Sequence, residues 1–77
     1  MINSVQSKMA RAALGWGVRD LAKMSAVAVD TISRLERGEA IMPRTLSAIQ
    51  SALEVAGIEF INNDRGDGVV KLRDQQA

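Results

Sequence analysis

Residues 18–38 read VRDLAKMSAVAVDTISRLERG, and this stretch decides the fold. Leu21 lies on the expected inward side of one short helix, and Ile32 and Leu35 lie on that of a second. Three residues, 25–27, join the two helices. Because helices joined by so short a link cannot lie antiparallel, we expect them to cross at a steep angle.

Further helices flank this pair on both sides. Residues 4–14 follow Asn3, which can cap a helix together with Gln6 three positions later. A last helix is expected to open at Pro43 and to end before Gly57. The central pair is expected at 18–24 and 29–37. Apolar residues at helical spacing mark the outer helices: Val5, Met9, Ala12 and Ala13 in the first, and Leu46, Ile49 and Leu53 in the last.

After Gly57 the apolar period changes from 3.6 residues to 2, which indicates strands. Residues 62–68 are dense in turn formers, so the sequence predicts a β-hairpin with a loop of about five to seven residues. Alternation places Ile58, Phe60, Val70 and Leu72 on one face, and Ile61 and Val69 on the other.

The predicted fold class is therefore mainly α, with four helices followed by a C-terminal β-hairpin. We expect a domain over residues 1–57, a hairpin over 58–73 and a frayed polar tail over 74–77. The single tryptophan, Trp16, is expected to fill the core at a helix junction.

Composition excludes several functions. The 77 residues contain no Cys and no His, which removes disulfides, thiolate nucleophiles and the usual zinc ligands. No carboxylate pair stands out at catalytic spacing, so we expect neither an enzyme nor a bound metal or cofactor. Apolar runs are too short to span a bilayer and no signal peptide is evident, which favours a cytoplasmic protein with no membrane partner. No small-molecule ligand is evident either.

The charge is uneven along the chain. Residues 1–53 carry seven basic and four acidic groups, a net charge of +3. Residues 54–77 carry three basic and five acidic groups, a net charge of −2. A small overall charge of +1 therefore conceals a mildly basic front and a mildly acidic rear.

The ordered set of Leu21-Ala22, Val27, the run from Thr31 to Glu39, Pro43-Arg44-Thr45-Leu46 and the Gly57-Ile58-Glu59-Phe60 exit resembles the lambda repressor, Cro and XRE family. The resemblance covers about residues 8–61 and implies a helix-turn-helix domain that binds double-stranded DNA. It implies that bases are read by four residues of the helix at 29–37: Val29, Asp30, Ser33 and Arg34. Phosphates would be met by Val18, Arg19, Lys23, Ala28, Thr31, Arg37 and Arg44.

Three positions depart from the family pattern. Ala26 stands in the turn where the family usually has Gly, and it would adopt a left-handed conformation at a cost of about 1 kcal/mol. Val18 replaces a frequent Gln, so only its backbone N–H is left to bind a phosphate. Ala28 replaces a Ser or Thr and caps the recognition helix poorly.

The base-reading residues also have structural alternatives. Arg34 fits guanine O6 and N7, or it pairs with Asp30 one turn earlier. Asp30 accepts from cytosine N4, orients Arg34, or stabilises the helix N-terminus. Val29 suits a thymine methyl, while Ser33 bonds DNA or its own backbone. The phosphate-binding positions are individually ordinary solvated charges.

A lone hairpin is marginal in water, so we expect homodimerisation through residues 58–73. The expected interface residues are Ile58, Phe60, Ile61, Val69, Val70 and Leu72. A two-fold dimer would place its recognition helices about 34 Å apart on an inverted-repeat operator. The predicted function is a transcriptional regulator, either a repressor or an autoregulator. The alternatives are a hairpin that only caps the core, and an antitoxin or anti-activator that binds a protein partner.

Overall fold

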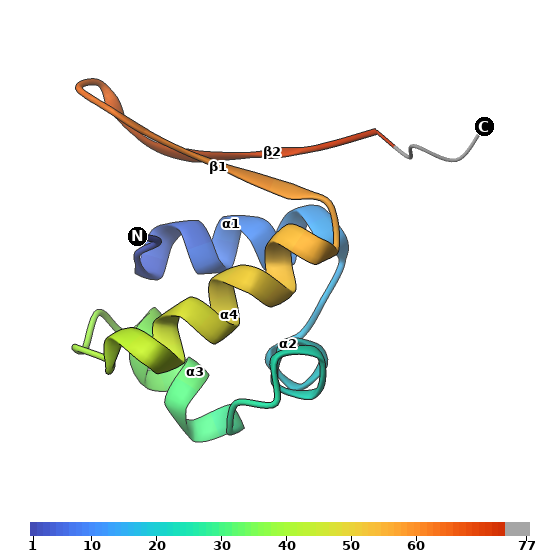
Figure 1. The fold of residues 1–77 in the computed structure, drawn as a ribbon, viewed down its shortest axis with the longest axis vertical. Coiled ribbons are helices and arrows are strands. Elements are labelled where there is room, and N and C mark those ends of the chain that lie inside the picture. Colours follow the sequence, from blue (N-terminus) through green and yellow to red (C-terminus); the bar gives the residue numbers. More distant parts are fainter. Residues whose placement is uncertain (74–77) are drawn as a thin grey trace.

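A computed structural model describes residues 1–73 as four helices followed by a two-stranded antiparallel hairpin (Figure 1). The mainly helical architecture expected from the sequence is confirmed, and the expected tail at 74–77 lies outside the described residues. The elements are α1 (Ser4–Leu14), α2 (Val18–Ser25), α3 (Val29–Glu36), α4 (Pro43–Val55), β1 (Ile58–Asn63) and β2 (Gly66–Lys71).

Local signals set the helix ends. The Asn3 side chain accepts a hydrogen bond from the Gln6 backbone N–H at 3.0 Å, and the Gln6 side chain accepts from the Asn3 N–H at 3.2 Å. This reciprocal capping box satisfies two N–H groups that a helix leaves without partners. Gly15 ends α1 in the left-handed conformation, with φ 70°. Pro43 opens α4, where its missing N–H costs nothing.

The core lies between the helices. The inward positions expected for α2, α3 and α4 are confirmed, with Leu46 only half-buried. Trp16 is half-buried against this core at the α1–α2 junction, as expected. The fully packed apolar cluster consists of Ile2, Ala10, Leu21, Ile32, Leu35, Ile49, Leu53 and Ile58.

The inward face of α1 differs from the apolar pattern of its sequence. Val5 and Met9 are exposed, at 49% and 39%, whereas Gln6 and Ser7 are fully buried. Gln6 is buried because its amide group finds four polar partners, two of them backbone carbonyls of the hairpin. Satisfied hydrogen bonds remove most of the cost of burying such a group. The apolar stripe on α1 therefore remains on the surface.

The hairpin has a tighter turn than the sequence indicated. Asn63 pairs with Gly66, so only Asp64 and Arg65 connect the strands, and the expected loop of five to seven residues is wrong. The Asn63 side chain accepts hydrogen bonds from the N–H groups of Arg65 and Gly66, at 2.8 and 3.2 Å. This side chain holds the chain in the turn. Strand pairing therefore continues up to Asn63 and Gly66, inside the segment 62–68 that was expected to be a loop.

The two faces of the hairpin also need correction. Phe60 pairs with Val69, so these two share the inner face with Ile58. Val70 pairs with Glu59 and therefore lies on the outer face with Ile61, where both are exposed. Ile58 is only 2% exposed, which makes it a residue of the domain's own core and withdraws it from the expected dimer interface. Leu72 is also exposed.

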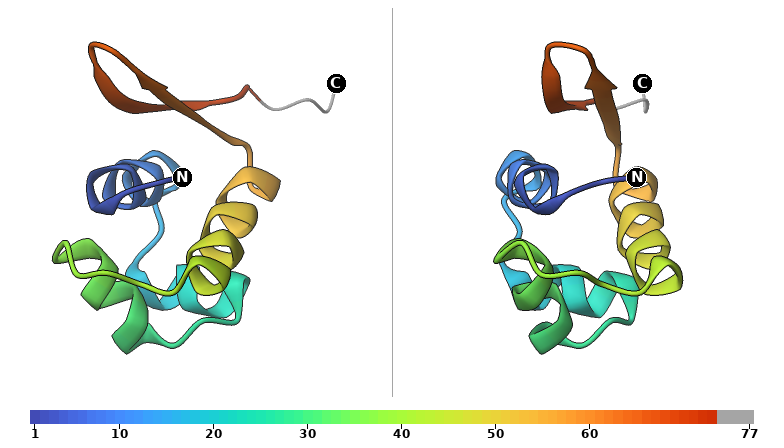
Figure 2. Two further views of the ribbon diagram at one scale, coloured as in Figure 1. Left: turned by 60° about the vertical axis from the view of Figure 1, so that its left-hand side comes forward. Right: turned by 90° about the vertical axis from the view of Figure 1, so that its left-hand side faces the viewer.

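The hairpin and the α2–α3 pair lie at opposite ends of the molecule (Figures 1 and 2). β2 packs along α1, whereas β1 continues from the end of α4. Figure 2 (right) shows α1 and α4 on opposite sides beneath the hairpin. The helix pair that carries the candidate site is therefore free of the hairpin.

Candidate nucleic-acid interface

The turn between α2 and α3 is built by three successive residues. The Ser25 hydroxyl donates to the Leu21 carbonyl at 2.6 Å and accepts from the Val27 N–H at 3.3 Å. Ala26 follows α2 in the left-handed region, with φ 59° and ψ 29°. This reversal turns the chain sharply, so that Figure 1 shows α2 end-on and α3 from the side. The steep crossing expected from the short link is thereby formed.

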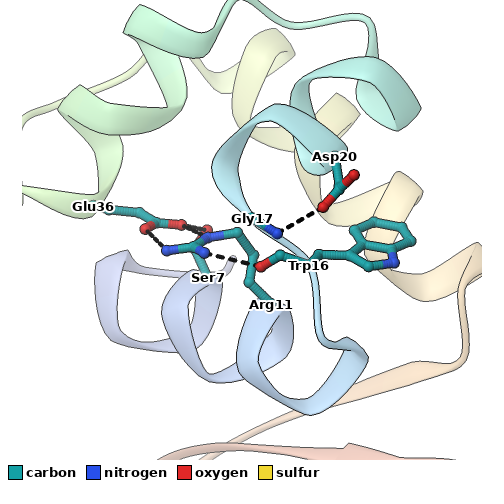
Figure 3. A network of polar contacts seen from close by, with 6 residues as sticks. All are labelled: Ser7, Arg11, Trp16, Gly17, Asp20 and Glu36. Carbon is teal, nitrogen blue, oxygen red and sulfur yellow. Dashed lines mark hydrogen bonds and ion pairs between the residues drawn. The ribbon is translucent and has the colours of Figure 1, made fainter.

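A polar network fixes the C-terminal end of α3 to α1 (Figure 3). The Glu36 carboxylate accepts from Arg11 Nη2 at 2.6 Å and Nε at 2.9 Å, a bidentate pair. It also accepts from the Ser7 hydroxyl at 2.6 Å. Arg11 Nη1 donates in turn to the Trp16 carbonyl at 3.1 Å, which ties in the segment leading to α2. The Glu36 carboxylate therefore joins α3 to α1, and Arg11 extends the network to the segment between α1 and α2.

The electrostatics of this network favour the charged forms. Burial alone would raise the pKa of Glu36, whose side chain is 8% exposed, but hydrogen bonds from Arg11 and Ser7 outweigh it. The pKa of Glu36 is therefore lowered from its ordinary value. The hydrogen bond to Glu36 raises the pKa of Arg11, against the opposing effect of burial. Both groups are charged at neutral pH, and the pair is fully formed.

The side of α3 that carries the expected base-reading residues is largely open to solvent. Val29, Asp30 and Arg34 are exposed, while Ser33 is half-buried. Within residues 1–73, no hydrogen bond or ion pair engages the side chains of Asp30 or Arg34. The expected structural alternative, an Asp30–Arg34 pair, is thus not formed in the free protein. An exposed, unpaired guanidinium on this helix is available to bond a base edge in the groove.

A comparison with family models matches residues 8–60 to a model described as helix-turn-helix. The chain belongs to this family. Its type is that of the lambda repressor and XRE proteins, whose helix-turn-helix domains bind DNA. No curated protein and no solved structure gives a significant match to the chain. The resemblance drawn from the sequence is confirmed.

In this helix-turn-helix domain, most of the expected phosphate-binding residues lie on the surface. Arg19, Lys23 and Arg44 are exposed, and none of their side chains has a partner within residues 1–73. Arg37 is exposed but pairs with Glu39 at 3.0 Å, so part of its charge is already neutralised. These basic groups come from α2, from α4 and from the C-terminal end of α3.

The remaining expected phosphate positions differ in access. Val18 is half-buried against the core, which leaves only its backbone N–H at the start of α2 for a phosphate. Thr31 is half-buried, and Ala28 is exposed. Ala28 makes no side-chain capping bond at the start of α3. The N-terminus of the recognition helix is therefore less supported than that of α2, where the Asp20 carboxylate accepts from the Gly17 N–H at 2.8 Å (Figure 3).

The sequence did not reveal the Arg11–Glu36 pair, because these residues are 25 positions apart. A partial signal was present in the sequence, because each of these charged residues follows a residue that is buried in the structure: Ala10 before Arg11, and Leu35 before Glu36. Among residues 1–73, no cluster of acidic side chains has the geometry to hold a metal ion, and no helix has the length and apolar character needed to cross a membrane.

Proposed function

We propose that this chain is a sequence-specific transcriptional regulator that binds an inverted-repeat operator as a homodimer. In this proposal α3 enters the major groove, where Arg34 reads guanine and Val29, Asp30 and Ser33 read its neighbours. Repression follows from covering a promoter, including the promoter of its own gene. Its place of action is then the cytoplasm.

The observation that carries the proposal is the contrast between the attached side of α3 and its exposed side. Its C-terminal end is held by a bidentate ion pair to Arg11, and Ile32 and Leu35 are buried. Its exposed side carries Val29, Asp30 and Arg34, and neither Asp30 nor Arg34 has a side-chain partner in residues 1–73. Base recognition requires a helix that is held rigidly and has polar side chains free to bond the bases. The helix must be fixed in position before its side chains can distinguish one base from another.

Phosphate contacts would supply most of the affinity. Arg19 and Lys23 on α2 and Arg44 on α4 are free to bind the DNA backbone on either side of α3. The backbone N–H groups of Val18 and Ala28 and the side chains of Thr31 and Arg37 complete the proposed set. Binding that rests on several such contacts falls steeply as salt rises.

A second candidate function is favoured by the outer face of the hairpin. Ile61, Val70 and Leu72 expose apolar side chains there, at the end of the molecule away from α3. An antitoxin or anti-activator would use such a face to bind a protein partner while its helix-turn-helix domain still bound an operator. This candidate adds a partner to the first one and does not replace it.

In vitro selection from a random duplex library tests the proposal. We expect enrichment of an inverted repeat whose half-sites lie about one helical turn apart. Binding to the selected duplex should exceed binding to random duplex of equal length at moderate salt. The absence of any enriched sequence would rule out a sequence-specific regulator. Enrichment of a single half-site would retain DNA recognition and remove the dimer.

A further inference from the structure

The open edge of β2 carries a self-complementary pattern. The Leu72 N–H donates to the Gly57 carbonyl at 2.8 Å, which extends the β1–β2 register by one pair. Because hydrogen-bonded pairs alternate along an antiparallel ladder, the backbone groups of Asp67, Val69 and Lys71 point away from β1. Within residues 1–73, no backbone bond outside the ladder engages these three N–H groups.

A second copy of the chain fits this edge in one register. Antiparallel self-pairing centred on Val69 brings Val69 opposite its own copy and uses all three outward-pointing residues on each side. The same register places Asp67 opposite Lys71 of the second copy, twice in each dimer. Opposite charges directly across strands stabilise an antiparallel pair. If the pairing were centred on Lys71, this lysine would lie opposite Lys71 of the second copy, and the two like charges would destabilise the pair.

The neighbouring surface of α1 continues this edge. Gln6 points toward the hairpin, where it donates to Ile61 and Gly68, and Ser7 points toward α3, where it donates to Glu36. With about 3.6 residues per turn, Val5 and Met9 lie on the other side of Gln6, away from α3 and α4. These exposed apolar side chains therefore lie beneath the β2 edge.

The geometry points to a homodimer in which β2 pairs with β2 and the α1 surfaces at Val5 and Met9 meet. This inference rests on the proposed regulator and names its dimer surface. The two-fold axis of two strands paired within one sheet is perpendicular to that sheet. Both sets of helices then lie beneath a four-stranded sheet, and both α3 helices face the same side, as one duplex requires.

Stacking of the outer hairpin faces gives a different result. Its two-fold axis lies in the plane of the sheet, so the recognition helices would face in opposite directions, away from each other. Ile61, Val70 and Leu72 would then not serve a dimer that binds one operator. In the edge-paired dimer these three side chains remain exposed and available to another protein.

Sedimentation of the full chain without DNA tests the inference. We expect a dimer, and we expect Lys71→Glu to weaken it about tenfold or more by placing Glu opposite Asp67. Met9→Glu should do the same by introducing charge where the α1 surfaces meet. Adding Asp67→Lys to Lys71→Glu should recover part of the loss, which only direct cross-strand pairing predicts. Circular dichroism establishes that each variant is folded.

Two control variants separate this inference from the proposed function. Val55 is 86% exposed on α4 and, with Met24, lines the shallow groove between α2 and α4. Val55→Glu should leave the dimer intact, and dissociation by this variant alone would overturn the inference in favour of that groove. Lys23→Glu should keep the dimer and weaken DNA binding.

Sedimentation and DNA selection together separate the edge pairing from the proposed function. If the native chain is a monomer at about 100 μM yet binds a selected duplex, the edge pairing is wrong and the regulator stands. The same holds if the native chain is a dimer that Lys71→Glu and Met9→Glu leave unchanged. A dimer that these two variants dissociate, but that selects no duplex, supports the edge pairing and overturns the proposed function.

Discussion

The backbone of Ala26 is the most strained feature at the scale of a single residue. Among residues 1–73 it is the only non-glycine with a positive φ, and it ends α2 in the conformation in which Gly15 ends α1. A Cβ in this region approaches the following carbonyl, at a cost of roughly 1–2 kcal/mol. We therefore expect Ala26→Gly to raise the free energy of unfolding by about 1 kcal/mol, after the larger unfolded-state entropy of glycine is subtracted. Urea unfolding measures this difference.

Gly15 provides the matched reverse experiment. Its φ of 70° is close to that of Ala26, and a Cβ added to it would meet no atom within 4 Å. Gly15→Ala should therefore cost about 1 kcal/mol through backbone conformation alone. If Ala26→Gly does not stabilise while Gly15→Ala destabilises, contacts of the Ala26 methyl group outweigh its strain.

Single residues differ in how far sequence reasoning could place them. The left-handed conformation of Ala26 was expected from the family resemblance, because Gly usually stands at this position of the turn. The burial of Gln6 was not, because its partners Ile61 and Gly68 are more than 50 positions away. The same distance problem hid the pairing of Glu36 with Arg11. Polar residues that are buried through distant partners leave no local periodic signal.

Gln6 also carries a prediction. It is fully buried, and its amide donates to two hairpin carbonyls while accepting from Asn3 and Asn62. Gln6→Met keeps the length of the side chain but leaves these partners unsatisfied, which should cost about 2–3 kcal/mol. Hydrogen exchange at the hairpin amides should accelerate. Gln50→Met is the control, because Gln50 is only half-buried and should lose less than about 1 kcal/mol.

At the scale of elements, the recognition helix depends on its attachment to α1 through Glu36. The folded-state pKa of Glu36 is lowered below its ordinary value of 4.5, since the hydrogen bonds from Arg11 and Ser7 overcome the effect of burial. Stability from this pair is therefore fully present above pH 4.5 and is lost as the pH falls through the folded-state pKa. We expect the free energy of unfolding, measured in urea from pH 7 to pH 3, to decrease over this acidic range.

Glu36→Gln separates this pair from the other carboxylates. The variant keeps the shape but leaves Arg11 without its counter-ion, so it should lose about 3 kcal/mol at neutral pH. Because its side chain does not titrate, its stability should fall less steeply below pH 4.5 than that of the native chain. Parallel losses in the two proteins would assign acid sensitivity to other groups.

Elements were easier to predict than their faces. Helix bounds agree closely with expectation because caps and stop signals at Asn3, Gly15 and Pro43 are local. The hairpin formed as expected, but the sequence analysis grouped Phe60 with Val70 on one face, whereas the structure pairs Phe60 with Val69 and places Val70 on the opposite face. A shift of one residue moves every side chain of a strand to the other face. The two-residue turn, fixed by Asn63, set the register.

At the scale of the whole molecule, the placement of unpaired basic side chains is more informative than the net charge. The net charge of the chain is only +1, yet its unpaired basic side chains Arg19, Lys23, Arg34 and Arg44 belong to the helices around the turn. The hairpin, at the opposite end, has no net charge, because Glu59, Asp64 and Asp67 are balanced by Arg65, Lys71 and Arg73 over residues 58–73. The acidic excess counted over residues 54–77 comes from Glu54, in α4, and from Asp74, which lies outside the described residues. What distinguishes the α2–α3 end is therefore its unpaired basic side chains and not a net charge.

This arrangement predicts different effects for three single substitutions. Lys23→Ala should weaken binding to every duplex and reduce the slope of log affinity against log salt by about 1 per protomer, as loss of a phosphate contact requires. Arg34→Ala should instead lower the preference for the selected site over random duplex by roughly 1–3 kcal/mol per half-site. Arg65→Ala, in the hairpin turn, removes the same charge at the far end and should change neither quantity.

Fluorescence anisotropy over a salt series measures both quantities for all three variants. Equal losses from Lys23→Ala and Arg65→Ala would show that net charge, rather than the placement of charge by the fold, governs affinity. An unchanged preference in Arg34→Ala would remove Arg34 from base reading and leave Val29, Asp30 and Ser33 as the remaining readers on α3. We expect Lys23→Ala to lose more affinity than Arg65→Ala, and Arg34→Ala to lose sequence preference. The reason is that the α2–α3 end of the molecule, and not the hairpin turn, presents a rigidly held helix to the groove.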